Sequence, residues 1–385
     1  MNRAFEEYYY KTYGVEMTVN YTTYASNEDL YAKLKSGATG YDIIIPSDYM
    51  IQRMIEDEDG NMLEELDFGN IPNYKYIAEH CKGLGYDPEE KYTVPYTYGM
   101  VGVIYNPTLM NPEDLDENGE INDKSWSLLW NEDYKGKILQ FNNPRDAFAT
   151  AMFYKGININ TADRNEWLVA LDALRVQKDI LQGYVNDEIF NKMTSDSATI
   201  APYFAGDYIT MKEDNENLKF YYPEEGTNVF VDAMCIPESS KNKEVAKEYI
   251  NFMLSEEVAV ANALYIGYAS PNSLVINSEE YKEELGEEAY DILYNYKTPE
   301  SIKEDCGFSP YYRSFSNEAE YGEDMQQYVN GLWEQLKTET DVEIWVHVTS
   351  ITIVVALVAG CSYSIYIKKK RSKFYRQRDK EAKNA

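Results

Sequence analysis

Three side chains with hydrogen-bonding groups follow an apolar run in the stretch YDIIIPSDYM, residues 41–50. Three consecutive isoleucines are typical of a strand that is buried on both faces. The run ends at Pro46, and Ser47, Asp48 and Tyr49 then offer a hydroxyl, a carboxylate and a phenol. These groups can either cap the helix that follows or face a ligand, because both roles use the same donors and acceptors.

Residues suited to metal binding or nucleophilic catalysis are scarce in this chain. It has four cysteines and two histidines, namely Cys81, Cys235, Cys306, Cys361, His80 and His347. The cysteines form no CxxC pair, and the set is too small for a zinc site or a Cys-His nucleophile. The sequence also lacks the phosphate-binding, dinucleotide-binding, hydrolase and zinc-protease motifs. The absence of a motif does not exclude an enzyme, but nothing in the sequence pairs a nucleophile with a base. We predict a protein that is not an enzyme and that uses no metal and no cofactor.

The acidic stretch DLDENGEIND matches part of a calcium-binding loop. Asp114, Asp116, Asn118 and Gly119 occupy the first, third, fifth and sixth positions of such a loop. The twelfth position is Ser125, where the loop needs a glutamate that binds calcium with both oxygens. An acidic surface turn is therefore the favoured interpretation.

Alternating helices and strands are expected to position these groups. The sequence predicts helices at about 3–13, 28–37 and 165–178 and two more within 240–264, and strands at 15–24, 41–46, 92–106 and 228–237. Gly14 ends the first helix, and Ser26 or Asn27 caps the second. Gly99 and Gly102 suit a bend between two lobes. The alternation predicts an α/β fold with a parallel sheet.

The charge of the chain is strongly acidic and unevenly distributed. The formal net charge is −30, and the first 343 residues carry 27 basic and 64 acidic side chains. Such a surface repels nucleic acid and attracts cations by long-range steering, although solubility alone would also explain it. We therefore expect no nucleic-acid partner.

An uncharged segment of 24 residues, 344–367, precedes a basic tail at 368–385. The segment is long enough to cross a bilayer core of about 30 Å as a helix. Trp345 and Tyr363 stand where interfacial anchors occur, and the positive-inside rule places the C-terminus in the cytoplasm. We predict a single-pass cell-membrane protein whose residues 1–343 are extracytoplasmic, either periplasmic or at the cell surface. The alternative for this segment is a buried core helix.

Seven segments occur in the order found in one known family: YTTYASNEDLYAKLKSGATGYDIIIPSDYMIQRM, TVPYTYGMVGVIYN, SWSLLWNEDYKGKI, YFAGD, EGTNVFVDAMCIP, KEVAKEYINFML and IGYASPN. Over about residues 3–337, the chain resembles the spermidine/putrescine-binding proteins of ABC importers. This resemblance implies a two-lobed periplasmic-binding-protein fold like type II. Its lobes would close around a polyamine and deliver it to the permease subunits of the importer.

The resemblance also implies how the chain divides. We expect lobe 1 from 1–99 and 232–276, lobe 2 from 100–231 and 277–340, and then the transmembrane helix at 344–367 and the cytoplasmic tail at 368–385. Hinge strands near Gly99 and Val231 would absorb the closure. The predicted function is a membrane-tethered, extracytoplasmic polyamine-binding subunit. A tethered binding protein or sensor for another small solute is the alternative.

A polyamine is a flexible chain of methylenes with ammonium groups, so its site needs carboxylates near the charges and aromatic faces along the chain. By position, the binding residues of the family fall on Ser47, Tyr49, Asn143, Asp146, Phe204, Phe230, Asp232 and Tyr268. Asp232 would hold the central ammonium group and Asp146 the distal one, with the four aromatic rings as walls. In this interpretation Asp48 caps the next helix. The structural alternatives are core packing for the phenylalanines, ordinary loops for the tyrosines, and helix or strand caps for the aspartates.

Several features depart from the family pattern. Phe204 and Phe230 stand where tryptophans are common, and phenylalanine is the weaker cation–π partner. Asn143 is neutral where an acid is often found. The first strand and the aromatic loop of the family would precede Met1, and the charged N-terminal helix is no signal peptide, so we expect a truncated start or an upstream partner reading frame. Arg313 or a neighbouring residue is the expected last contact with the ligand.

Overall fold

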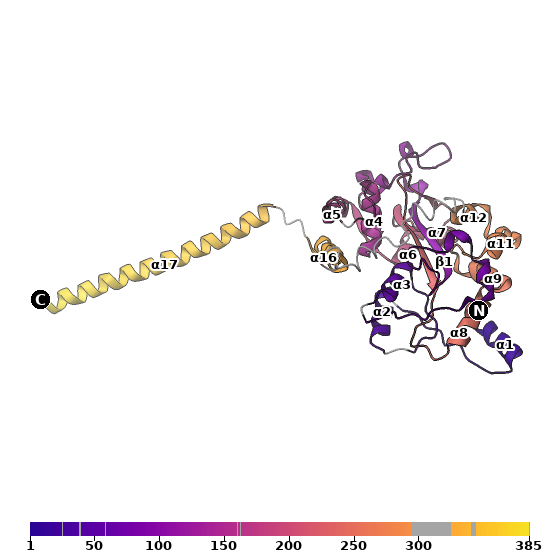
Figure 1. Cartoon of the computed structure of the whole chain (residues 1–385). Coiled ribbons are helices and arrows are strands. Elements are labelled where there is room, and N and C mark those ends of the chain that lie inside the picture. The colour runs from indigo at the N-terminus through magenta and orange to yellow at the C-terminus, as the bar shows by residue number, and fades with distance from the viewer. Residues whose placement is uncertain are drawn as a thin grey trace. The chain divides into compact units, whose positions relative to one another are not determined.

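The computed structural model of this chain describes residues 1–384 except 25, 38–39, 58, 160, 162, 295–324 and 340–343. The chain divides into two compact units, Met1–Leu336 and Lys337–Ala385. The described strands and most of the helices belong to the first unit, and the long C-terminal helix belongs to the second (Figure 1). The first unit has the predicted α/β architecture.

The described strands pair in a mixed pattern. They are β1 (Val94–Tyr105), β2 (Ile138–Phe141), β3 (Leu181–Val185), β4 (Ile200–Phe204), β5 (Lys219–Tyr221) and β6 (Val229–Met234). Their order is β3-β2-β4-β1-β5, and β6 also pairs with β1. β2 is parallel to β3 and β4, whereas β1 is antiparallel to β4, β5 and β6. The predicted parallel pairing is therefore confirmed for β2, β3 and β4 but not for the rest.

The long strand β1 takes part in two sheets. Its residues Val94–Met100 pair with β6, and its residues Val101–Tyr105 pair with β4. A Cβ at Gly102, next to this change of partner, would lie 2.2 Å from Phe220 Cζ and 2.6 Å from Tyr221 O. The glycine that the sequence suggested as a bend is thus required by the close approach of the neighbouring strand.

Each half of β1 lies in its own hydrophobic core. The core around its second half contains Trp126 and Trp167, and the core around its first half contains Leu30 and Ile250. These four side chains are completely buried. Removing apolar surface from water stabilises such cores by about 25 cal/mol per Å². Because β1 belongs to both, one continuous strand joins the two cores.

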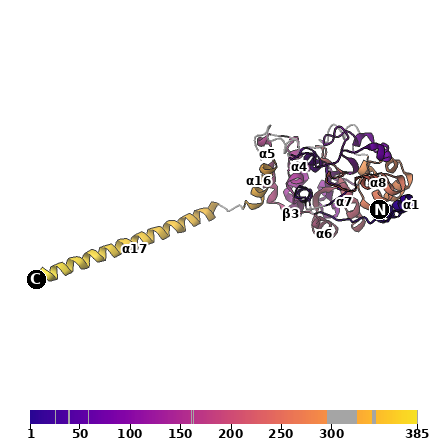
Figure 2. The same ribbon diagram turned by 60° about the horizontal axis from the view of Figure 1, so that its bottom comes forward.

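Helices lie around the strands in both views (Figure 2). The described helices are α1 (Asn2–Tyr13), α2 (Asn27–Lys35), α3 (Asp48–Ile55), α4 (Pro144–Tyr154), α5 (Arg164–Lys178), α6 (Glu188–Thr194), α7 (Ala205–Asp214), α8 (Lys243–Met253), α9 (Glu256–Ile266), α10 (Ser273–Ile276), α11 (Glu279–Leu285), α12 (Glu287–Tyr294), α16 (Met325–Thr338) and α17 (Ile344–Asn384). Val329 and Trp333 of α16 lie in the same core as Trp167. The last turns of the first unit therefore complete the core around the second half of β1.

The predicted helices of the first unit are confirmed. α1 ends at Gly14, whose φ of 70° lies in the left-handed region. Ser26 caps α2, because its Oγ accepts a hydrogen bond from the N–H of Asp29 (3.1 Å). The helices predicted at 165–178 and within 240–264 correspond to α5, α8 and α9. Local signals suffice in these cases because caps and stops depend on residues that are close in sequence.

Two predicted strands are wrong. Residues 15–24 have no regular structure. In the second, YDIIIP, Ile44 and Cys235 exchange two backbone hydrogen bonds of 2.9 Å but form only an isolated bridge. Pro46 accepts a hydrogen bond from the N–H of Ala233 (3.1 Å). A proline has no N–H to return, so the ladder is interrupted at this residue.

The predicted membrane span, 344–367, falls within α17. The side chains of residues 344–350 lie outside the described residues. In the part of the chain that the structure describes, no helix is long and apolar enough to cross a membrane. The predictions of a transmembrane helix and of a membrane location are therefore not supported.

Candidate ligand-binding site

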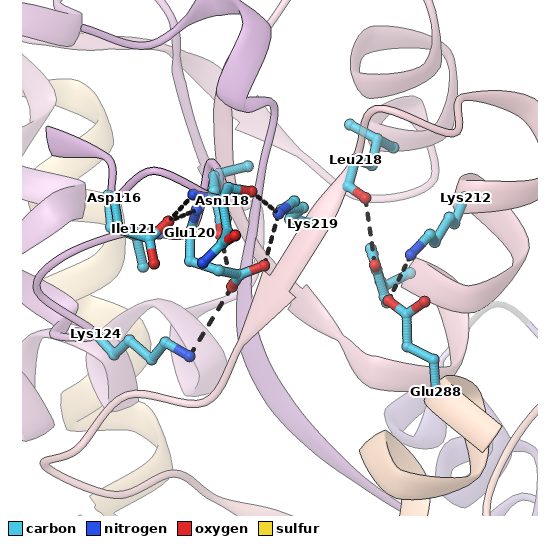
Figure 3. A network of polar contacts seen from close by, with 11 residues as sticks. Asp116, Asn118, Glu120, Ile121, Lys124, Lys212, Leu218, Lys219 and Glu288 are labelled. Atoms are coloured by element: carbon cyan, nitrogen blue, oxygen red, sulfur yellow. Dashed lines mark hydrogen bonds and ion pairs between the residues drawn. The ribbon is translucent and has the colours of Figure 1, made fainter. Parts of the chain in front are cut away.

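The acidic stretch at 114–123 is a surface turn, as the sequence indicated. Asp116 Oδ1 accepts hydrogen bonds from the N–H groups of Asn118 and Glu120, each at 2.8 Å. Lys219 Nζ donates to Asn118 O at 2.9 Å and to Glu120 Oε1 at 2.6 Å (Figure 3). The ammonium group of Lys219 thus places a positive charge at this acidic turn. Among the described residues, no cluster of side chains is suited to hold a metal ion.

Ser47 and Asp232 meet at the end of the YDIIIP segment. Ser47 Oγ donates to Asp232 Oδ1 at 2.7 Å, and Thr97 Oγ1 donates to Asp232 Oδ2 at 3.4 Å. Asn27 Nδ2 donates in turn to Ser47 Oγ at 3.1 Å. Within the described residues Asp232 has no ion pair, and burial raises the pKa of its carboxyl group. The structure therefore holds this carboxylate with neutral hydroxyl donors.

Asp48 is a buried carboxyl group next to this pair, with a side chain that is 3% exposed. It is the first residue of α3 and not its N-cap, which is Ser47, so the predicted capping role was wrong by one position. Its Oδ1 accepts from the N–H of Tyr49 (2.7 Å) and its Oδ2 from that of Val231 (3.2 Å). Burial raises the pKa of Asp48 to about 7, and the positive charge of Arg145 opposes this rise.

These carboxyl groups give a testable pH dependence of stability. Burial raises the pKa of Asp48 from 3.8 to about 7 and also raises that of Asp232. A raised pKa in the folded state means that stability is present at low pH and is lost as the pH rises through the folded value. We expect the ligand-free protein to be about 2 kcal/mol more stable to urea at pH 5.5 than at pH 8. The variant Asp48→Asn should flatten this profile, and an unchanged slope would contradict the assignment.

Arg145 lies among the predicted site residues, although the sequence analysis did not select it. Its Cζ lies 4.4 Å from the ring centroid of Tyr49, and its Nε lies 3.7 Å from Asp146 Oδ1. Its charge also opposes the rise in the pKa of Asp232. The feature of the sequence that could have indicated Arg145 as a site residue is its position next to Asp146, in the first turn of α4.

Asn143 and Asp146 form a reciprocal cap at the start of α4. Asn143 Oδ1 accepts from the N–H of Asp146 (2.8 Å), and Asn143 Nδ2 donates to Asp146 Oδ2 (3.0 Å). Asp146 is 3% exposed, and its Oδ1 accepts no hydrogen bond from the described residues. Asn143 is therefore the N-cap of α4, a role that the sequence analysis considered only for the aspartates, while Asp146 Oδ1 accepts no hydrogen bond from the described residues.

The three remaining predicted residues, Phe204, Phe230 and Tyr268, form a row of aromatic rings. The centroids of Phe204 and Phe230 are 5.3 Å apart, and those of Phe230 and Tyr268 are 6.0 Å apart, both edge to face. Phe230 is 9% exposed, so the core-packing alternative also describes it in part. Since Phe230 and Asp232 are two residues apart on β6, their side chains share one face of the strand.

The structure thus links the eight predicted residues in two connected groups. The polar group contains the hydrogen-bonded pair Asp232 and Ser47 and the capping pair Asp146 and Asn143. Arg145 contacts Tyr49 and Asp146, and its charge acts on Asp232. The aromatic group is Phe204, Phe230 and Tyr268. β6 joins the groups because it carries both Phe230 and Asp232. The expected contact at Arg313 lies outside the described residues.

Aromatic rings and buried carboxyl groups side by side are suited to bind a small solute. The chain belongs to the bacterial extracellular solute-binding protein family, whose model matches residues 3–286. It is an extracytoplasmic binding protein, and the prediction of a non-enzymatic role is confirmed.

Relatives with known names support this assignment. The chain is 29% identical over 255 residues to a spermidine/putrescine-binding periplasmic protein of Salmonella typhimurium, covering 66% of this chain and 70% of the relative. It is 27% identical over 263 residues to a putrescine/cadaverine-binding protein of Pseudomonas aeruginosa, covering 66% and 72%. A solved structure, a putative spermidine/putrescine ABC transporter from Listeria monocytogenes, matches with a TM-score of 0.66 and 30% identity, covering 88% and 96%. The α/β periplasmic-binding-protein fold is therefore confirmed.

Proposed function

We propose that this chain is the solute-binding subunit of an ABC importer and that its solute is a polyamine. The observation that carries the proposal is the state of Asp232. Its carboxyl group is held by the hydroxyl groups of Ser47 and Thr97, and the described residues offer it no ion pair. A desolvated carboxylate is costly without a charged partner, and an ammonium group of a ligand would supply one.

Two further features suit the rest of a polyamine. Asp146 Oδ1 is buried, and although Arg145 Nε lies 3.7 Å from it, it accepts no hydrogen bond from the described residues and can accept one from a second ammonium group. The rings of Phe204, Phe230 and Tyr268 offer apolar faces for methylene groups and cation–π contacts for the ammonium groups. A site of this kind selects a long molecule with separated positive charges.

The named relatives point the same way. Spermidine, putrescine and cadaverine are the solutes in the names of proteins that match about two thirds of this chain. The related structure from Listeria monocytogenes is titled as part of an ABC transporter. The expected partners are therefore a polyamine and the permease subunits of an importer.

The proposed mechanism is closure of two lobes around the solute. We place lobe 1 at 1–99 with 232–276 and lobe 2 at 100–231 with 277–340. The change of partner along β1 supports a hinge near Gly99, and the return strand β6 supports one near Val231. A hinge in two adjacent strands lets the lobes rotate with few broken contacts.

A second candidate is a binding protein or sensor for a solute that carries both charges. Arg145 lies next to Tyr49 and Asp146, and a guanidinium group can bind a carboxylate of the ligand. An amino acid or a related zwitterion would use Arg145 and Asp232 together. This candidate function uses the same fold as the first and differs from it in the solute that is bound.

A thermal-shift screen of the full chain separates the two candidates. A ligand that binds only the folded state at 100 times its Kd adds about 2.7 kcal/mol of stability. We expect this stabilisation with spermidine or putrescine and none with amino acids. A shift with amino acids alone would favour the zwitterion candidate, and the absence of any shift with polyamines would refute the proposal.

A further inference from the structure

Arg145 lies at a place where a helix does not favour a positive charge. It is the second residue of α4, directly after Pro144, and the N-cap of this helix is Asn143. The N–H groups of a first helical turn carry a partial positive charge, so a cation beside them is repelled. The contacts that hold the guanidinium group at this place must therefore come from other side chains and not from the helix backbone.

The guanidinium group of Arg145 covers one face of the ring of Tyr49. Its Cζ lies 4.4 Å from the ring centroid, where the negative face of the ring attracts a cation. Tyr49 belongs to α3, and its hydroxyl group donates a hydrogen bond to Glu28 Oε1 at 3.0 Å, which fixes the ring. A cation of the protein itself therefore occupies an aromatic face that an ammonium group of a ligand could use.

Arg145 also lies close to the buried carboxyl group of Asp146 without completing a hydrogen bond to it. Arg145 Nε is 3.7 Å from Asp146 Oδ1, and this oxygen accepts no hydrogen bond from the described residues. A hydrogen bond between a cationic N–H group and a carboxylate is about 2.7–2.9 Å long. Arg145 thus offsets the charge of Asp146 but leaves its oxygen to a better placed donor.

The positive charge of Arg145 acts on two more buried carboxyl groups. Burial raises the pKa of Asp48 and that of Asp232, and the charge of Arg145 opposes both shifts. One guanidinium group is therefore shared among three carboxyl groups, those of Asp48, Asp232 and Asp146. A second cation in the site would stabilise the charged form of each of them.

Arg145 can reach water from the position that it occupies. Its side chain is 25% exposed, whereas the side chain of Asp146 is 3% exposed. An arginine has a long flexible stem, so its charged end can turn into solvent while the stem stays against the protein. The guanidinium group can therefore leave Tyr49 and Asp146 while the backbone of α4 stays in place.

We propose that Arg145 is a resident cation, which competes with the ligand for Tyr49 and Asp146 and so determines how tightly the site holds a polyamine. The inference rests on the proposed function, in which Asp146 receives an ammonium group. On binding, this ammonium group replaces the guanidinium group, which turns into solvent. The contacts that Arg145 gives up are subtracted from the free energy of binding, so the affinity is lower than the carboxyl groups alone would provide.

The test is calorimetric titration of the full chain with spermidine, in a double-mutant cycle of Arg145→Gln and Asp146→Asn. We expect Arg145→Gln to raise the affinity by about tenfold, because the competitor for Asp146 is removed. In the Asp146→Asn background, the same substitution should raise the affinity by less than about threefold. Arg175→Gln is the matched control, because Arg175 pairs with Asp172 on α5 at 2.6 Å. It removes the same charge and should change the affinity by less than about twofold.

The sign of the change in affinity separates competition from a supporting role of Arg145. A lower or unchanged affinity in Arg145→Gln would overturn the inference while leaving polyamine binding in place, and so would an equal gain in both backgrounds. If the unmodified chain binds no polyamine, the proposed function fails and this inference fails with it. Melting without ligand provides the folding control, and we expect a cooperative transition for Arg145→Gln. If this variant does not fold, the same cycle with Arg145→Met, which keeps an apolar stem against Tyr49, decides the outcome.

Discussion

Replacing Asp232 with asparagine should lower the affinity for spermidine by about a hundredfold, which corresponds to about 2.7 kcal/mol. The amide oxygen can still accept the hydroxyl hydrogen of Ser47, and the amide NH2 group can donate to the hydroxyl oxygen of Thr97, so the local structure should persist. What is lost is the negative charge that faces the ammonium group. Calorimetric titration of the variant measures this loss directly.

The matched control for Asp232→Asn is Asp116→Asn. Asp116 lies in the acidic surface turn and accepts two backbone hydrogen bonds there. This variant changes the net charge of the protein by the same amount, so it measures the effect of long-range attraction alone. Equal losses of affinity in the two variants would show that Asp232 does not contact the ligand.

Replacing Gly102 with alanine should lower the free energy of unfolding by about 3 kcal/mol. The new Cβ would lie 2.2 Å from Phe220 Cζ and 2.6 Å from Tyr221 O, and the second of these is a backbone atom that cannot rotate away. The strands β1 and β5 would have to separate. The midpoint of urea unfolding, with its slope, gives the change in stability.

Gly183→Ala in β3 is the control for this substitution. A Cβ at Gly183 would have no heavy atom within 4 Å among the described residues, so an alanine there should leave the stability within about 0.5 kcal/mol of the unmodified protein. A similar loss at Gly102 and Gly183 would mean that the glycines matter for backbone flexibility and not for the close approach of β5.

The helices and long strands could be predicted from sequence because their signals are local. Gly14 and Ser26 end and cap α1 and α2 through contacts within a few residues. The strand predictions at 15–24 and 41–46 were wrong because strand formation depends on partners that are distant in the sequence. Residues with high β propensity favour a strand, but a strand also needs a neighbouring strand with which it exchanges backbone hydrogen bonds. Pro46 has no N–H group to donate in such an exchange.

The site was predictable only where the order of the matching segments fixed it. Ser47 and Asp232, far apart in the sequence, are hydrogen bonded, and their contact with a ligand stays a prediction. Arg145 was missed and Asp48 was read only as a helix cap, because their importance depends on burial and on charges from other elements. No pattern along the sequence shows which charged side chains are buried and desolvated in the folded protein.

The shared strand β1 has a consequence for the order in which the protein can fold during synthesis. Val94 pairs with Met234 and Tyr105 pairs with Ile200, so both halves of β1 must wait for partners that are made much later. In a chain emerging from the ribosome or from an export channel, the second half of β1 would therefore stay unpaired until β4 follows, and the first half until β6 follows. Such non-local pairing slows folding and leaves apolar surface exposed in the meantime. We expect pulse proteolysis of truncated chains to show protection of the first half of β1, Val94–Met100, only after residue 234 is included.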